Sequence, residues 1–109
     1  MSERDPHRAA EFIIKNAKHY AAAKANRMFL EERRKSTKAL LMNESTGKTV
    51  SDREQFAYSH PSYLELLQEF KSSILEEETL RLQIRAAELT IEIWRSEQAT
   101  NRNQDRAMR

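Results

Sequence analysis

The sequence of 109 residues contains no cysteine, one glycine and two prolines. Without cysteine the chain can form neither a disulfide nor a thiolate metal site, which fits a reducing compartment. With so little glycine and proline, long segments contain no residue that breaks a helix. Apolar residues make up 39% of the chain and charged residues 33%. This composition favours long helices or a coiled coil over a compact mixed fold.

The sequence also lacks a long apolar run. The longest runs are the four residues from Tyr20 to Ala23 and the four from Ala39 to Met42, whereas a membrane helix needs about 20. We therefore expect no signal peptide and no membrane contact, and we expect the protein to be cytoplasmic.

A long helix is predicted over residues 6–43. Asp5 and Pro6 form the pattern of an N-cap followed by proline in the first turn, where its missing N–H costs nothing. No glycine or proline follows before Gly47. Apolar residues recur at the helical spacings of three and four, and they are Ile14, Ala17, Ala21, Ala25 and Met28.

A turn and a short helix are predicted next. Gly47 marks the turn, and Ser51 with Glu54 matches a capping box that opens a helix over residues 52–59. Pro61 ends this helix because the residue before a proline is pushed out of helical geometry. Ser59 or His60 can then cap a third helix over residues 61–99, and we expect 100–109 to be a flexible polar tail.

The stretch LRLQIRAAELTIEIWR, residues 80–95, alternates apolar and polar residues like two short strands. No turn residue separates its halves, and Ala86 and Ala87 lie at the junction. We therefore predict one continuous helix that carries two apolar stripes on roughly opposite faces. The first stripe is Leu80, Ile84, Ala87, Ile91 and Trp94. The second stripe is Leu82, Ala86, Leu89 and Ile93.

The two stripes predict a homo-oligomer. The first long helix can cover one stripe, so we expect the second to be buried between subunits as the oligomer interface. The alternative is that the short helix folds back and covers the second stripe. The predicted fold is all-α and a single domain, with two long helices joined by a turn and a short helix in an elongated helical hairpin or bundle.

No pattern for catalysis or metal binding is present. His7, His19 and His60 are scattered, without the spacing of zinc or di-iron helix motifs. Gly47 and Lys48 resemble the end of a phosphate-binding loop, but the required first glycine is replaced by Met42. We expect no enzyme activity, no catalytic residue, no cofactor, no metal and no small-molecule substrate.

Charge is distributed unevenly along the chain. Residues 1–48 hold eleven Lys or Arg and six Asp or Glu, and residues 49–109 hold eight and eleven. Such segregation indicates internal pairing, head-to-tail assembly or a surface for a polyanion. The predicted nucleic-acid-binding residues form a strip on the first helix: Lys24, Arg27, Arg34, Lys35 and Lys38. Glu31 lies in the same strip, so the alternative is a solvated face with intrahelical ion pairs.

The layout NAKHYAAAKANRMFLEERRKSTKALL, then a glycine turn, then YLELLQEFKSSILEEETLRLQIRAAELTIEIWRSEQA, resembles small helical proteins of tailed phages and prophages. The chain is most similar to phage recombination mediators, which help a recombinase assemble on protein-coated single-stranded DNA. The resemblance covers residues 12–99 and includes short matches at Lys38-Ala39 and Trp94-Arg95. It implies a basic first helix, an oligomerising last helix and a location in the bacterial host.

Two functions follow as alternatives, both non-enzymatic. The first is an oligomeric accessory protein in DNA recombination or replication, which binds single-stranded nucleic acid, a recombinase or both. The second is a protein-only oligomeric adaptor or scaffold that acts through helix–helix contacts. The segregated charge favours the first.

Overall fold

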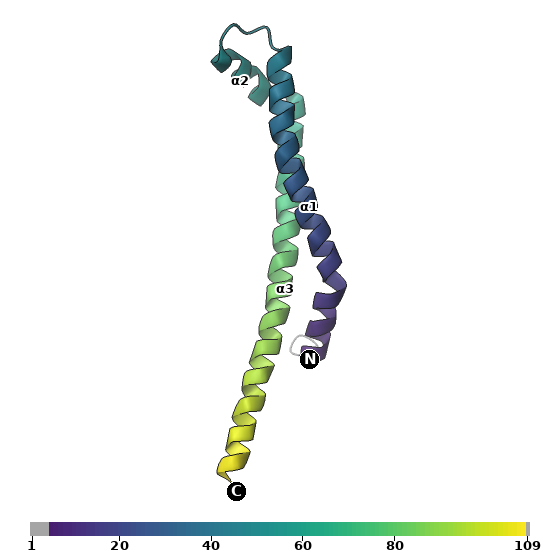
Figure 1. Ribbon diagram of the computed structural model, residues 1–109, viewed down its shortest axis with the longest axis vertical. Coiled ribbons are helices and arrows are strands. Elements are labelled where there is room, and N and C mark those ends of the chain that lie inside the picture. Colours follow the sequence, from purple (N-terminus) through teal and green to yellow (C-terminus); the bar gives the residue numbers. More distant parts are fainter. Residues whose placement is uncertain (1–4, 109) are drawn as a thin grey trace. The chain divides into compact units, whose positions relative to one another are not determined.

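The computed structural model describes residues 5–108, which form three α-helices and no strand. Helix α1 spans Pro6–Glu44, α2 spans Val50–Ser59 and α3 spans Pro61–Ala107 (Figure 1). The predicted all-α fold, with two long helices joined by a turn and a short helix, is confirmed. Within residues 5–108, no helix is both long enough and apolar enough to cross a membrane.

The start of α1 follows the predicted capping pattern. The backbone N–H of His7 donates to Asp5 Oδ1 over 2.9 Å, and Pro6 is the first helical residue. A carboxylate here satisfies an unpaired N–H and interacts favourably with the positive end of the helix dipole.

The start of α2 differs from the prediction. Thr49, and not Ser51, is the N-cap: its extended backbone precedes the helix and its hydroxyl accepts from the N–H of Asp52 over 3.1 Å. Ser51 instead lies within the first turn. Thr is among the preferred capping residues, and Thr49 has an acidic residue three positions later, in the first turn where negative charge is favourable.

The junction of α2 and α3 is a single residue, His60. Its backbone is extended, and its Nδ1 accepts from the N–H of Ser62 over 3.1 Å. Pro61 then occupies the first position of α3, where it needs no hydrogen-bond donor. His60 is thus one of the two predicted caps.

Helix α3 is unbroken through residues 80–95, which confirms the prediction of one helix rather than two strands. It continues to Ala107, so the polar residues from Thr100 to Ala107 are helical where a flexible tail was expected. Solvent-exposed polar residues are compatible with a helix when glycine and proline are absent. Arg106 in the last turn also interacts favourably with the negative end of the helix dipole.

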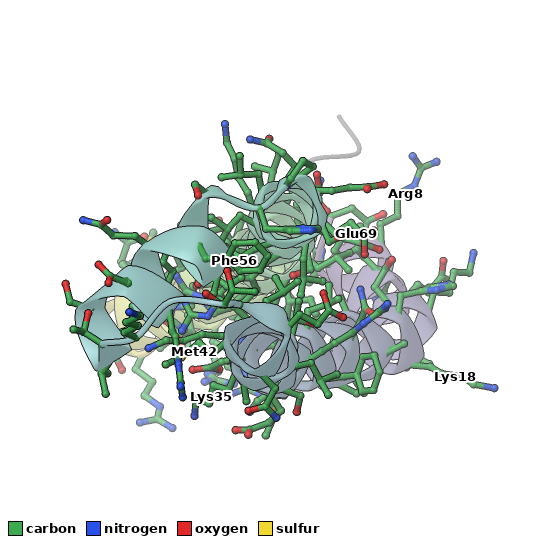
Figure 2. The ribbon with its side chains drawn as sticks, turned by 90° about the horizontal axis from the view of Figure 1, so that it is seen from above. Arg8, Lys18, Lys35, Met42, Phe56 and Glu69 are labelled. Carbon is green, nitrogen blue, oxygen red and sulfur yellow. The ribbon has the colours of Figure 1, made fainter. Side chains whose placement is uncertain are left out.

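The chain divides into two compact units. Unit 2 is the continuous stretch Ala21–Glu78, and unit 1 combines Met1–Tyr20 with Thr79–Arg109. Each unit therefore contains a piece of α1 and a piece of α3. The core cluster of unit 2 lies where all three helices meet (Figure 2, with Met42 labelled), and it comprises Leu41, Ala57 and Tyr63, with Met42 and Leu67 packed against it.

The apolar residues whose spacing predicted the α1 helix do not lie on its buried side. Ile14 and Met28 are exposed, at 76% and 51%, and Ala17, Ala21 and Ala25 are exposed too. The buried or half-buried residues recur instead at alternating spacings of three and four, the pattern of a coiled-coil seam. In unit 2 they are Ala23, Arg27, Leu30, Arg34, Thr37 and Leu41.

The seam residues of α3 have the same spacing. In unit 2 they are Tyr63, Leu66, Phe70, Ser73 and Glu77. In unit 1 the first predicted stripe is covered as expected at Ala87, which is buried, and at Leu80, Ile84 and Ile91, which are half-buried. Trp94 remains 41% exposed. The α3 side of the seam is therefore apolar in unit 1 and contains both apolar and polar residues in unit 2.

Candidate functional site

The predicted basic strip lies on α1 within unit 2, and its five cations have different surroundings. Arg27 is half-buried in the seam. Its Nε donates to Glu77 Oε1 over 2.7 Å and its Nη2 to Oε2 over 3.4 Å. Its Nη1 also donates to Glu31 Oε2 over 3.1 Å. The hydrogen bond with Glu77 raises the pKa of Arg27, and two carboxylates already compensate its charge.

Two other cations of the strip face solvent. Lys24 is exposed and forms no ion pair with a described residue. Lys35, labelled in Figure 2, is exposed as well, and its Nζ lies 3.4 Å from Glu32 Oε1. A solvent-exposed pair of this kind contributes little to stability. Both lysines are therefore available to a ligand at small cost.

The last two cations of the strip lie over aromatic rings. Arg34 Cζ is 5.3 Å from the centroid of the Phe70 ring, and Lys38 Nζ is 4.7 Å from the centroid of the Tyr58 ring. Both distances are in the range of cation–π attraction. Interaction with Tyr58 raises the pKa of Lys38, so this lysine is charged at neutral pH. Neither cation forms an ion pair within residues 5–108.

These side chains line a cavity of about 370 Å³. Its lining residues are Arg34, Lys35, Lys38, Tyr58 and Tyr63. The two tyrosine rings meet edge to face, with centroids 5.3 Å apart. No carboxylate from the described part of the chain lines this cavity. A second cavity of unit 2, by contrast, combines Arg33 with Glu65, Glu69 and Glu76 among its lining residues.

Positive charge is concentrated at this cavity and is not spread over unit 2. Residues 21–78 contain nine Lys or Arg and ten Asp or Glu. Internal pairing, one of the predicted consequences of the segregated charge, occurs between Arg27 on α1 and Glu77 on α3. Sequence reasoning identified the cations but missed Tyr58 and Tyr63, because these residues reach the cavity from other helices.

The second predicted stripe lies on an exposed face of α3 in unit 1. Leu82, Leu89 and Ile93 are 56%, 41% and 58% exposed, and Ala86 is exposed too. The alternative, that the short helix covers this stripe, does not occur, because α2 packs into the core of unit 2 through Ala57.

Charged residues flank the second stripe on the same helix. Arg85 Nη1 lies 3.4 Å from Glu92 Oε1 and 3.6 Å from Glu88 Oε1. These three side chains are about half exposed, so their interactions within one chain are solvated and weak. The stripe is thus an apolar surface with Arg85, Glu88 and Glu92 beside it on the same helix.

Groups for metal binding do not converge in the described residues. No cluster of three or more His, Asp or Glu side chains there could hold a metal ion. His7 and His19 are exposed, and His60 caps α3.

Comparison of the chain with family models, curated proteins and solved structures gave no match. The function is therefore argued from the two surfaces themselves: the basic cavity of unit 2 and the second stripe of α3.

The Arg27–Glu77 pair yields a prediction about stability. Glu77→Leu leaves a half-buried guanidinium without its main partner, so the melting temperature should fall. Arg27→Leu combined with Glu77→Leu removes both charges and should recover most of the loss, because apolar pairs replace buried ion pairs without penalty. Thermal unfolding followed by circular dichroism measures both variants.

The matched control is Glu32→Leu, which breaks the exposed pair with Lys35 and should change the melting temperature little. If Glu77→Leu is no more destabilising than Glu32→Leu, the pair does not hold the seam together.

Proposed function

We propose that this chain is a non-enzymatic helical adaptor or scaffold that self-associates through the second stripe of α3. The observation that carries this proposal is the exposure of Leu82, Leu89 and Ile93 on a helix whose opposite stripe is buried or half-buried except at Trp94. An amphipathic helix buries one apolar face. A second apolar face on the same helix is stabilised when another helix covers it.

A second copy of the chain fits this surface in an antiparallel orientation. Leu82 then packs beside Ile93 of the second copy, and Ala86 beside Leu89. The same arrangement brings Arg85 opposite Glu92 of the second copy, and the two-fold axis repeats this contact. A parallel pair would instead bring Glu92 near Glu97. Charge complementarity therefore supports the antiparallel dimer.

The stripe itself can be tested with Leu89→Asp. Burial of a leucine stabilises by about 1.5–3 kcal/mol, and a symmetric interface loses this contribution twice. The aspartate would also be buried without a partner. We expect the dissociation constant of the oligomer to rise at least about a hundredfold, with most of the helicity retained. Sedimentation equilibrium and circular dichroism measure the two quantities.

Leu40→Asp is the matched control, since Leu40 is 64% exposed on a different helix. It should leave the oligomer unchanged. A wild-type chain that sediments as a monomer at high micromolar concentration would refute self-association.

The antiparallel orientation makes a separate prediction. Arg85→Glu alone and Glu92→Arg alone each replace two attractions with two repulsions, and each should weaken the dimer about tenfold. An equimolar mixture of the two variants should form a heterodimer. In it the introduced glutamate of one chain faces the introduced arginine of the other, and the second contact is the native pair. If the mixture associates no better than the separate variants, the antiparallel arrangement is wrong.

The second candidate is an accessory protein in DNA recombination or replication, as the resemblance to phage recombination mediators implies. The basic cavity favours it, because Arg34 and Lys38 are uncompensated cations beside aromatic rings. Single-strand binding proteins combine cations for the backbone with rings for the bases. The compensation of Arg27 by Glu77 reduces the predicted strip to Lys24, Arg34, Lys35 and Lys38.

Salt titration tests this candidate. If the four cations contact phosphates, single-strand binding should weaken with salt at a slope of about −0.7 per contact. One chain then binds weakly, and self-association should increase the affinity by multiplying the contacts. Leu89→Asp should therefore reduce strand binding, and Arg34→Glu with Lys38→Glu should abolish it while the oligomer persists. A wild-type oligomer that ignores single-stranded DNA at about 50 mM salt would exclude nucleic-acid binding.

A further inference from the structure

We propose that the cavity lined by Arg34, Lys35, Lys38, Tyr58 and Tyr63 is a binding site for a phosphate group. The phosphate is carried either by a small phosphate ester or by the backbone of a single strand. The site gives the second candidate function a location, and it does not depend on self-association because the stripe of α3 belongs to unit 1.

The charges around the cavity support an anion as the ligand. Arg34 and Lys38 converge on it without a carboxylate partner among the described residues. Lys35 adds a third positive charge, and its Nζ lies 3.4 Å from Oε1 of the exposed Glu32. Glu54 is a further acidic neighbour of Lys38, but it does not line the cavity. A phosphate group, singly charged in a strand backbone and up to doubly charged in a monoester, matches this excess of positive charge and accepts charge-assisted hydrogen bonds from it.

The aromatic rings prepare these cations for binding. Arg34 Cζ lies 5.3 Å from the centroid of the Phe70 ring, within the range of cation–π attraction. Lys38 Nζ lies 4.7 Å from the centroid of the Tyr58 ring, and the core residue Tyr63 packs edge to face against Tyr58. The side chains are thus partly ordered before a ligand arrives, which lowers the entropic cost of binding.

The donors of the cavity also suit phosphate. Guanidinium and ammonium groups donate hydrogen bonds and cannot accept them, and each tyrosine hydroxyl can donate one. Phosphate oxygens only accept when ionised, so every group of the lining can contribute. The volume of about 370 Å³ falls in the usual range of small-ligand sites, about 300–1,000 Å³. It therefore has room for a substituent on the phosphate.

The test is a titration of the full-length protein followed by backbone amide resonances in NMR. The probes are a nucleoside 5′-monophosphate, the same nucleoside without phosphate, and a short oligothymidylate without a terminal phosphate. We expect the monophosphate to shift the resonances of Lys38 and Tyr58, and the nucleoside to leave them in place. Shifts with the oligothymidylate alone would assign the site to strand backbones, and shifts with the monophosphate alone would assign it to small esters.

Single substitutions test whether the phosphate binds in this cavity. Arg34→Gln and Lys38→Gln should each weaken binding about tenfold or more, because each removes a charge-assisted hydrogen bond. Lys18→Gln is the matched control, since it removes the same charge from an exposed position of α1 that belongs neither to the cavity nor to the predicted strip. Leu89→Asp should leave monophosphate binding unchanged even where it dissociates the oligomer, which separates this test from that of the scaffold.

Three results would overturn the proposal. The first is the absence of shifts with both phosphate-bearing probes. The second is an equal response to the nucleoside, which would mean that the phosphate is not recognised. The third is an equal loss of affinity in Lys18→Gln, which would indicate attraction by overall charge. Circular dichroism of Arg34→Gln and Lys38→Gln checks that the helices remain intact.

Discussion

The bidentate contact between Arg27 and Glu77 is the constraint on which the packing of unit 2 depends. The seam of α1 there offers few large apolar side chains, chiefly Leu30 and Leu41. A charged pair tolerates a change of register less well. If one helix shifts along the other, both charges lose their partner while they remain poorly solvated. Polar residues in a seam are known to fix register in this way.

The elements of this fold were predictable from the sequence, but the buried face of α1 was not. After Pro6, residues 7–44 contain neither glycine nor proline and hence no residue that breaks a helix. Local capping patterns located Asp5 and, with Ser59 as the alternative, His60, but they placed the cap of α2 at Ser51 instead of Thr49. Apolar spacing points to the side of α1 that carries Ile14 and Met28, whereas the row of α1 that is buried or half-buried contains arginine. Arg27 is tolerated in the seam through a carboxylate 50 positions away, which no local pattern reveals.

The two candidate surfaces also differ in how much of each could be predicted from the sequence. The second stripe of α3 is a property of one helix, so periodicity alone located Leu82, Leu89 and Ile93 on one face. The basic cavity is assembled from three helices, and sequence reasoning supplied only the row of cations on α1. Whether a lysine on a helix is solvated, paired or stacked depends on tertiary neighbours. That distinction separates Lys24 from Lys38, although both belong to the same predicted strip.

The division of the chain has a consequence for folding order. Unit 2 is one continuous stretch, so its helices can meet after closure of the short turn around Gly47. Unit 1 joins two segments that are separated by all of unit 2, so in an unfolded chain they meet by closing a longer loop, at an entropic cost that grows slowly with loop length. Once unit 2 has formed, the two segments of unit 1 are already held near each other. Unit 1 should therefore assemble last and open first, and α3 carries its exposed stripe on this later-forming part.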